Sequence, residues 1–269
     1  RLRGEVDALL YVRALEEIGS PDDWYDLSSE PSEHELIALL GRSRARPPAA
    51  SADVDIPCGS DALSGTLVVP AAARAAVIFA HTEAGSCICP RDLQVARALR
   101  NAGMATLLFE MLSPRESASD EAAGQLRSDI DVLAQRLVLA AEWVRDRPQT
   151  RGLRIGCFGA NAGATAALTA AARRPGLLEA LVCCRGRPDL VAASDLVRVR
   201  APTLLLVGGR DLPGLELNRD AAQLLRVEHE LSAVPHAAHL FEEPGVLEEV
   251  GNRSVAWFAR AFEPAAAAA

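Results

Sequence analysis

The sequence predicts an α/β protein: a mostly parallel sheet with helices on both faces, preceded by a short N-terminal appendage. From residue 53 onward, short apolar runs alternate with helical segments, the pattern of parallel strands joined by crossover helices. The chain has 269 residues, enough for one large domain with an appendage. Hydrophobic residues make up 49% of it and aromatic residues only 4%. We therefore expect a core built of alanine, leucine and valine.

The individual elements follow from the apolar runs and from the glycines and prolines between them. Residues 53–57 and 63–70 form a predicted hairpin across Gly59-Ser60-Asp61. Further strands are predicted at 75–81, 105–110, 153–158, 178–184, 203–207 and 228–234. Helices are predicted at 90–101, at 121–147, in the small-residue segment after Gly163, at 217–225 and at 247–262.

The domain organisation follows from shifts in composition. Residues 1–45 form a predicted separate arm, with Trp24-Tyr25 in an acidic loop and a short helix at 31–41. Residues 44–52 contain Pro47-Pro48 and are predicted to be a linker. The main domain is expected at 53–263, and the alanine run at 264–269 is expected to be a tail without function.

Charge and cysteine usage narrow the class of function. The net charge of −8 argues against nucleic-acid binding through a broad basic face. Six unevenly placed cysteines indicate buried reduced thiols in a cytoplasmic protein. Cys87-Ile-Cys89 is too sparse for a zinc site without a second ligand pair, so we expect no metal and no cofactor. No signal peptide is visible, and no apolar stretch reaches the ~20 residues needed to cross a bilayer.

A glycine-framed turn follows the predicted strand 153–158. Gly159 and Gly163 flank Asn161 in the spacing Gly-x-Asn-x-Gly, and a helix of small residues follows. This is the layout of a nucleophile elbow, Gly-x-Ser-x-Gly, in which a strained strand-to-helix turn presents the central residue. The glycines are needed because the turn is tight and the helix packs close behind it. The frame of a nucleophilic site is present, with an asparagine at the nucleophile position.

An acid and a histidine follow the elbow in the order that such a site uses. Asp211 ends Val207-Gly-Gly-Arg-Asp, in the loop after a strand, and His239 ends Val234-Pro-His-Ala-Ala-His, after the last strand. In a triad the acid orients the imidazole and stabilises its charged form, while the imidazole moves the proton. His236 is the rival for the base. We favour His239 because it directly precedes the apolar Leu240-Phe241.

With these motifs in place, residues 53–262 resemble the dienelactone-hydrolase-like branch of the α/β-hydrolases, and more narrowly the hydrolase half of bacterial phosphoribosyltransferase–dienelactone hydrolase fusion proteins. The matching stretches are Phe79-Ala-His81, Ala105-Thr-Leu-Leu-Phe109, Gly156-Cys-Phe-Gly159, Gly186-Arg-Pro-Asp-Leu190, Pro202-Thr-Leu-Leu-Leu-Val-Gly-Gly209 and His239-Leu-Phe-Glu-Glu-Pro-Gly245. Residues 1–43 are similar to the last segment of the transferase half. The chain shows no Asp-Asp-x-x-x-Thr-Gly loop, so phosphoribosyl transfer is not supported and this arm is interpreted as a packing arm or lid.

The resemblance implies an α/β-hydrolase fold and roles for particular residues. Asp211 and His239 match the acid and the base, whereas Asn161 does not match the serine or cysteine nucleophile. Backbone N–H groups at Ala162 and in the loop at His81-Thr82 correspond to the substrate-binding, or oxyanion, position. Glu83 departs from the Gly/Ser-rich loop of the family. An inward Glu83 carboxylate would oppose an oxyanion, or would serve as a second acid or base.

Three hypotheses remain open for this site. In the first, His239 and Asp211 carry out non-hydrolytic acid–base chemistry, such as isomerisation, cyclisation, dehydration or water addition, on a small carbonyl or lactone metabolite. In the second, the chain is an inactive pseudo-hydrolase that binds a small ligand or a protein partner. In the third, a water activated by histidine hydrolyses esters or lactones. We expect a small-molecule ligand, no nucleic acid and no membrane, with a homodimer left open.

Overall fold

The centre of the fold is an eight-stranded sheet with the strand order β1-β2-β4-β3-β5-β6-β7-β8. The structure is a computed structural model, and it describes residues 49–81, 89–120 and 124–263. The strands are β1 (Ala50–Cys58), β2 (Asp61–Val69), β3 (Ala75–Ala80), β4 (Met104–Phe109), β5 (Arg154–Ala160), β6 (Ala180–Cys184), β7 (Thr203–Gly208) and β8 (His229–Val234). β1, β2 and β4 pair antiparallel, and all pairs from β4 to β8 are parallel. The predicted mostly parallel sheet is confirmed.

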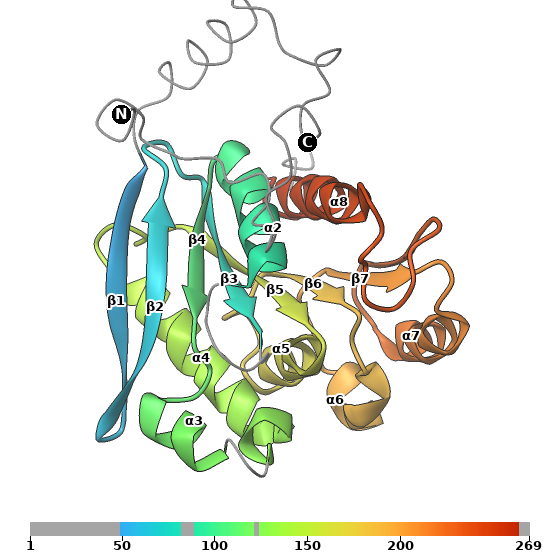
Figure 1. Cartoon of the computed structure of the whole chain (residues 1–269), viewed down its shortest axis with the longest axis horizontal. Helices are drawn as coiled ribbons and strands as arrows, with labels where there is room; N and C mark the ends of the chain where they lie inside the picture. Colours follow the sequence, from blue (N-terminus) through green and yellow to red (C-terminus); the bar gives the residue numbers. More distant parts are fainter. Residues whose placement is uncertain (1–48, 82–88, 121–123, 264–269) are drawn as a thin grey trace, which may run out of the picture. The chain divides into compact units, whose positions relative to one another are not determined.

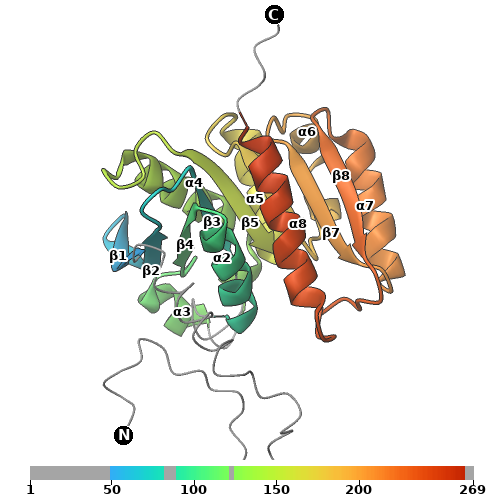
Figure 2. The same ribbon diagram turned by 90° about the horizontal axis from the view of Figure 1, so that it is seen from above.

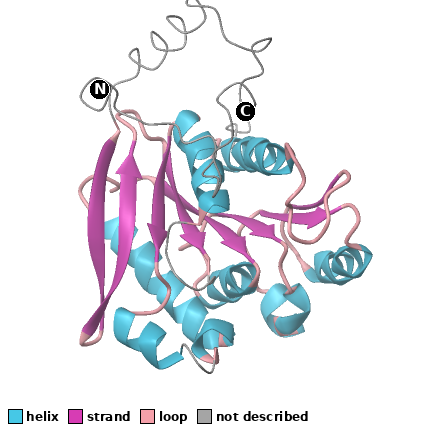
Figure 3. Cartoon of the chain, viewed as in Figure 1, coloured by secondary structure: helices cyan, strands magenta, loops and turns pink. Residues whose placement is uncertain are grey.

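Helices cover both faces of this sheet (Figures 1 and 3). They are α2 (Pro90–Asn101), α3 (Pro114–Asp120), α4 (Ile130–Asp146), α5 (Ala162–Arg173), α6 (Ala193–Leu196), α7 (Leu212–Leu224) and α8 (Val246–Ala261), with 3-10 turns η3 (Leu126–Ser128) and η4 (Pro188–Leu190). α2 and α8 lie side by side on one face (Figure 2). α4 and α5 pack together on the other face (Figure 1). Each face therefore buries its own apolar layer.

The two apolar layers have the composition that the sequence predicts. Leu133 and Leu137 of α4 pack with Leu168 of α5 in one layer. Leu99 of α2 packs with Phe258 of α8 in the other. Alanines fill most of α5, which is buried almost along its whole length. Small side chains let this helix lie close to the strands, so it can start immediately behind a tight turn.

Most predicted elements are confirmed within a few residues, and two helices need correction. The first hairpin closes at Cys58 and Asp61, and α2 has the predicted bounds. The helix predicted at 121–147 is wrong at its start, because α4 begins at Ile130 after Asp129 caps it. The helix predicted at 217–225 starts too late, because α7 begins five residues earlier, at Leu212, after the N-cap residue Asp211.

The predicted segment boundaries at the two ends of the chain lie mostly outside the described residues. The arm 1–45 and the tail 264–269 fall there and stay predictions. Of the linker predicted at 44–52, residues 50–52 belong to β1, so the sheet begins before residue 53. Within the described residues, no helix combines the length and the apolar character needed to cross a membrane.

The carboxyl ends of five neighbouring strands lie in register and define one edge of the sheet. Ala80 of β3 pairs with Gly159 of β5, and Ala160 pairs with Cys184 of β6. Cys184 pairs in turn with Leu206 of β7, and Gly208 pairs with Val234 of β8. The residues that follow these strands therefore meet at the edge where ligands bind in open parallel sheets.

Candidate active site

Asn161 lies on the turn between β5 and α5 in a conformation that side-chain-bearing residues rarely adopt. Its φ is 53° and its ψ is −123°, a strained combination that costs about 1–3 kcal/mol. The Asn161 N–H donates to the Cys184 carbonyl at 3.1 Å, and the Asn161 carbonyl accepts from the Ala164 N–H at 3.1 Å. The strained elbow is thus built around an amide side chain, and hydrogen bonds to β6 and α5 hold it in place.

The glycines of the elbow are required by close packing. A Cβ on Gly163 would lie 1.9 Å from the Ala80 carbonyl oxygen at the end of β3. A Cβ on Gly159 would lie 2.7 Å from Cα of Ala164. The first turn of α5 therefore lies directly against the ends of β3 and β5, as the sequence spacing predicts. Ala162 is the first residue of α5, so its N–H belongs to the helix donors that lack an intrahelical partner.

Asp211 and His239 form a hydrogen-bonded pair. His239 Nδ1 lies 2.7 Å from Asp211 Oδ2, and the other oxygen, Oδ1, accepts the Gly214 N–H at 3.0 Å. The Asp211 side chain is 13% exposed and that of His239 is 52% exposed. Because an ionised carboxylate only accepts hydrogen bonds, Nδ1 carries the ring proton and Nε2 is the basic nitrogen. His236, the rival in sequence, lies in the same loop with φ 61°.

The loop that carries His239 is held on both sides. The Ala238 N–H donates to Glu243 Oε1 at 2.7 Å, and this hydrogen bond lowers the pKa of Glu243 below its usual value. Arg185, after β6, donates from Nη1 to the Leu240 carbonyl at 3.3 Å. Phe241 is buried at 1% exposure in the layer beside α8. These contacts account for Phe241 and Glu243 in the stretch after His239.

The two glycines before Asp211 bring the acid loop against the histidine loop. The Gly209 N–H donates to the Val234 carbonyl at 2.8 Å, and the Arg210 N–H donates to the Ala237 carbonyl at 2.9 Å. A Cβ on Gly208 would lie 2.4 Å from the Ala238 carbonyl oxygen. The distance between Asp211 and His239 is therefore fixed by backbone contacts as well as by the side-chain pair.

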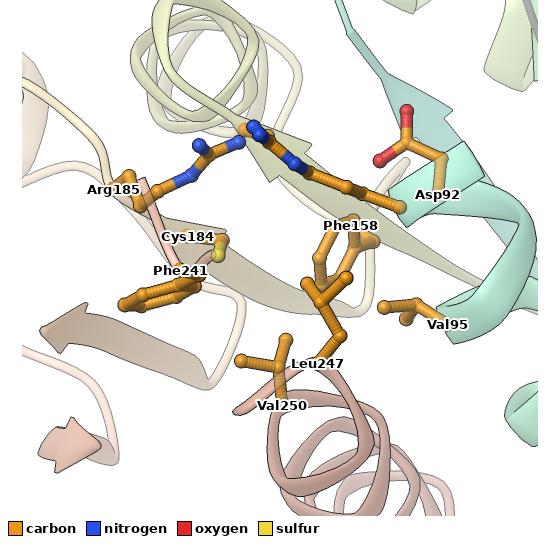
Figure 4. Close-up of a pocket in the computed structure, with 10 residues that line it drawn as sticks. Asp92, Val95, Phe158, Cys184, Arg185, Phe241, Leu247 and Val250 are labelled. Atoms are coloured by element: carbon orange, nitrogen blue, oxygen red, sulfur yellow. The ribbon is translucent and has the colours of Figure 1, made fainter. Parts of the chain in front are cut away.

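Arg185 is a buried cation that the sequence reasoning missed. It is 5% exposed and has φ 54°, and its guanidinium lies 5.8 Å from the centre of the Phe241 ring. Arg185 and Asp92 both line a cavity of about 10 Å³. In Figure 4 their side chains lie on one side of this cavity, and the apolar side chains of Leu247 and Val250 lie on the other. This cavity holds about one water molecule, so it is too small for a metabolite.

Burial also sets the pKa of the Cys184 thiol, which lines this cavity. Cys184 is buried, and loss of hydration raises its pKa to about 12. The neighbouring Asp92 carboxylate acts in the same direction, while Arg185 lowers the pKa. The thiol is therefore protonated at neutral pH, and a protonated thiol is a poor nucleophile.

The remaining predicted site residues have separate outcomes. His81 directly follows β3, and its Nδ1 lies 2.7 Å from Asp92 Oδ2 in the first turn of α2. Its side chain is therefore oriented by α2. Thr82 and Glu83 fall in 82–88, outside the described residues, so the predicted oxyanion role of Thr82 and the orientation of Glu83 stay predictions.

The sheet order, the strained elbow and the acid–histidine pair after the last two strands define an α/β-hydrolase. The chain is similar to a dienelactone hydrolase from Anabaena variabilis, with which it shares 44% sequence identity. The crystal structure of that protein superposes on this one with a TM-score of 0.77, and the match covers 80% of this chain and 99% of that one. The chain belongs to the dienelactone hydrolase family, as the sequence resemblance predicted. No protein-family model matches the chain.

Two further comparisons show how far the similarity extends. Est1E from Butyrivibrio proteoclasticus has a TM-score of 0.66 at 14% identity, covering 79% of this chain and 99% of that one, and shares the fold. Two Mycobacterium tuberculosis proteins, each named "putative phosphoribosyl transferase", are 40% identical over 242 residues, which is 86% of this chain and 54% of theirs. The chain spans about half the length of these curated relatives.

Proposed function

We propose that this chain uses His239 as an acid–base group on a small carbonyl- or lactone-containing metabolite, without a covalent intermediate at Asn161. One observation carries the proposal: the hydrogen-bonded pair of Asp211 and His239 is intact while the elbow presents an amide. An amide does not act as a nucleophile on the enzymatic timescale. A histidine oriented by a partly buried acid retains its capacity to move protons.

The chemistry follows from the donors and acceptors around the pair. His239 Nε2 removes a proton from the carbon beside the carbonyl, and Asp211 stabilises the imidazolium that forms. The Asn161 amide and the Ala162 N–H are the donors for the carbonyl oxygen as negative charge develops on it. Return of the same proton to another carbon gives an isomer. Its delivery to a leaving hydroxyl gives dehydration, and the reverse path adds water.

A second candidate is hydrolysis of esters or lactones by a water that His239 activates. Two observations favour it: half of the His239 side chain is exposed to solvent, and the 44% identical neighbour is a dienelactone hydrolase. In this reaction Nε2 takes a proton from water, and the hydroxide attacks the carbonyl carbon. Loss of the usual nucleophile slows such enzymes about a million-fold, which places this candidate second.

A panel of lactones, activated esters, enol esters and β-hydroxy ketones tests the proposal. Products are identified by mass spectrometry with the parent protein, Asn161→Ser and His239→Gln. We expect a product of unchanged mass, or one that differs by one water without ester cleavage, and a rate about 10²–10⁴-fold lower in His239→Gln. His229→Gln, an exposed histidine whose ring contacts the Val227 carbonyl, is the matched control and leaves the rate unchanged.

Other outcomes assign the site differently. Acid and alcohol products from the parent protein, lost in His239→Gln, support hydrolysis through water. Turnover that appears only in Asn161→Ser contradicts both catalytic hypotheses, because the site would then be active only with a serine nucleophile. A ligand that binds equally well to His239→Gln and never reacts shows a binding protein.

A further inference from the structure

We propose that His81, Cys89 and Asp92 form a binding site for one divalent transition metal ion of the Zn²⁺ class. The three residues come from two elements. His81 directly follows β3, Cys89 is the N-cap residue of α2, and Asp92 lies in the first turn of that helix. In sequence, Cys89 has no second ligand pair near it. The fold supplies that pair from the end of a neighbouring strand and from the helix itself.

The geometry brings three different donor atoms together. A histidine ring nitrogen, the Cys89 Sγ and an Asp92 carboxylate oxygen all lie within 4.8 Å of one another, and His81 Nδ1 is 2.7 Å from Asp92 Oδ2. Zn²⁺ bonds of about 2.0–2.1 Å to nitrogen or oxygen and about 2.3 Å to sulfur place the tetrahedral ligands of such a set about 3.3–3.6 Å apart. The three donors therefore need only small side-chain rotations to meet one ion.

Burial and charge favour a dication here. The side chains of His81 and Asp92 are 12% and 6% exposed, and Cys89 is half-buried. A dication bound by one thiolate, one carboxylate and one neutral imidazole gives an assembly without net charge, which limits the cost of burial. Arg185 lines the same small cavity as Asp92, but its guanidinium is directed to the Leu240 carbonyl and the Phe241 ring.

The donor types select the class of metal. Thiolate and imidazole ligands suit Zn²⁺ and Co²⁺, whereas Mg²⁺ and Ca²⁺ prefer oxygen ligands alone. Three protein ligands are the number found in zinc sites that keep a position for water or substrate. The site also lies at the edge of the sheet that carries Asn161, since Ala80, the residue before His81, packs against Gly163 of α5. The proposal concerns binding and does not depend on the function proposed above.

Titration of the full chain with Zn²⁺ or Co²⁺ tests this site. The protein is first treated with a chelator and kept in a phosphine reductant so that its thiols stay reduced. We expect one equivalent of Co²⁺ to bind, with thiolate-to-cobalt charge-transfer absorption in the near ultraviolet, and Zn²⁺ to displace it. The charge-transfer band disappears in Cys89→Ser, and affinity falls at least tenfold in His81→Gln and Asp92→Asn.

Matched controls separate this site from other thiols and histidines. Cys58→Ser, in β1, and His229→Gln, in β8, leave affinity and spectrum unchanged. Cys89→Ser keeps the proposal testable if His81→Gln or Asp92→Asn fails to fold, because Cys89 is only half-buried. Absence of stoichiometric binding overturns the proposal. A cobalt spectrum that is the same in Cys89→Ser as in the parent also overturns it.

Discussion

Asn161 is the residue whose backbone conformation conflicts most clearly with its side chain. At φ 53° and ψ −123°, a side chain is strained while glycine is not. We predict that Asn161→Gly is more stable than Asn161→Ala by about 1 kcal/mol, because both variants lack the amide and differ only in the Cβ. Urea unfolding followed by circular dichroism gives this difference in the free energy of unfolding.

The interior of α5 supplies the comparison for that prediction. Ala170→Gly, at a buried helical position, loses at least about 1 kcal/mol, the usual direction for glycine against alanine. At Asn161 the difference in the free energy of unfolding between glycine and alanine is expected to have the opposite sign. If Asn161→Gly is less stable than Asn161→Ala by a similar amount, the backbone at Asn161 is not strained.

Gly214 is a second residue on which the site depends. A Cβ there would lie 2.3 Å from Asp211 Oδ2, the oxygen that contacts His239. We predict that Gly214→Ala displaces the carboxylate and breaks the pair. In proton NMR at neutral pH, the downfield Nδ1–H signal that is absent from His239→Gln is also lost in Gly214→Ala.

A helical glycine with more room is the matched control for Gly214. A Cβ on Gly251 of α8 would lie 3.3 Å from the Cβ of Ala98, a contact that a small shift relieves. Alanine also favours the helix over glycine by about 1 kcal/mol. Gly251→Ala should keep the His239 signal and the stability of the parent. Survival of the signal in Gly214→Ala would show that the pair does not need this glycine.

At the scale of elements, one carboxylate contributes to holding the loop between β8 and α8. Glu243 accepts the Ala238 N–H, and this hydrogen bond lowers its pKa. A lowered pKa means that the contribution of Glu243 to stability is present above the unfolded pKa of about 4.3 and is lost as pH falls through the folded value. We predict that Glu243→Ala increases amide exchange at Ala238 at pH 7, and that the parent shows the same increase only under acid conditions.

The conservative replacement distinguishes a hydrogen bond from a charge effect. Glu243→Gln keeps an acceptor for the Ala238 N–H and should preserve protection at pH 7, while removing the acid-dependent change. Hydrogen exchange measured residue by residue, as protection factors, reports both. Equal protection of Ala238 in the parent and in Glu243→Ala at pH 7 would show that Glu243 does not hold the loop.

Element boundaries show what periodicity predicts and what it misses. The apolar spacing from Leu126 onward continues that of α4, so the sequence predicts one long helix. The structure ends that run because Asp120 accepts the N–H groups of Leu126 and Arg127, and because Asp129 accepts those of Asp131 and Val132. Asp129 before an apolar run is an N-cap signal, and it could have placed the start correctly.

The predictable part of the candidate site is the part carried by short spacings. The glycine frame of Asn161 and the loop positions of Asp211 and His239 follow from local sequence. Arg185 and Asp92 do not, since their importance comes from contacts across the fold: Arg185 with Leu240, and Asp92 with His81. Such contacts leave no periodic signal in one sequence.

For the whole molecule, the absence of lysine makes alkaline behaviour simple. The chain contains no lysine, and its two tyrosines are Tyr11 and Tyr25, in the N-terminal arm. Arginine stays charged throughout the accessible range. Apart from the amino terminus and these tyrosines, cysteines are therefore the groups that titrate between about pH 8 and 11. Burial raises the pKa values of Cys157, Cys183 and Cys184, that of Cys184 to about 12.

Because burial raises their pKa values, these three thiols make the folded state less stable as pH rises. A folded pKa above the unfolded value means that the thiol's contribution is complete below the unfolded pKa, about 8.5, and is lost as pH rises above it. Well above that unfolded pKa, each thiol lowers the free energy of unfolding by up to about 1.4 kcal/mol per pH unit. Urea unfolding in a phosphine reductant between pH 8 and 10.5 should show this decline in the free energy of unfolding. Cys183→Ala should reduce the slope of that decline by the contribution of one thiol.

The cavity left by Cys183→Ala lowers the free energy of unfolding equally at every pH, so it changes the intercept and not the slope. A slope in Cys183→Ala equal to that of the parent would mean that this thiol ionises without unfolding, and the buried environment between β6 and α5 would have to be open to water.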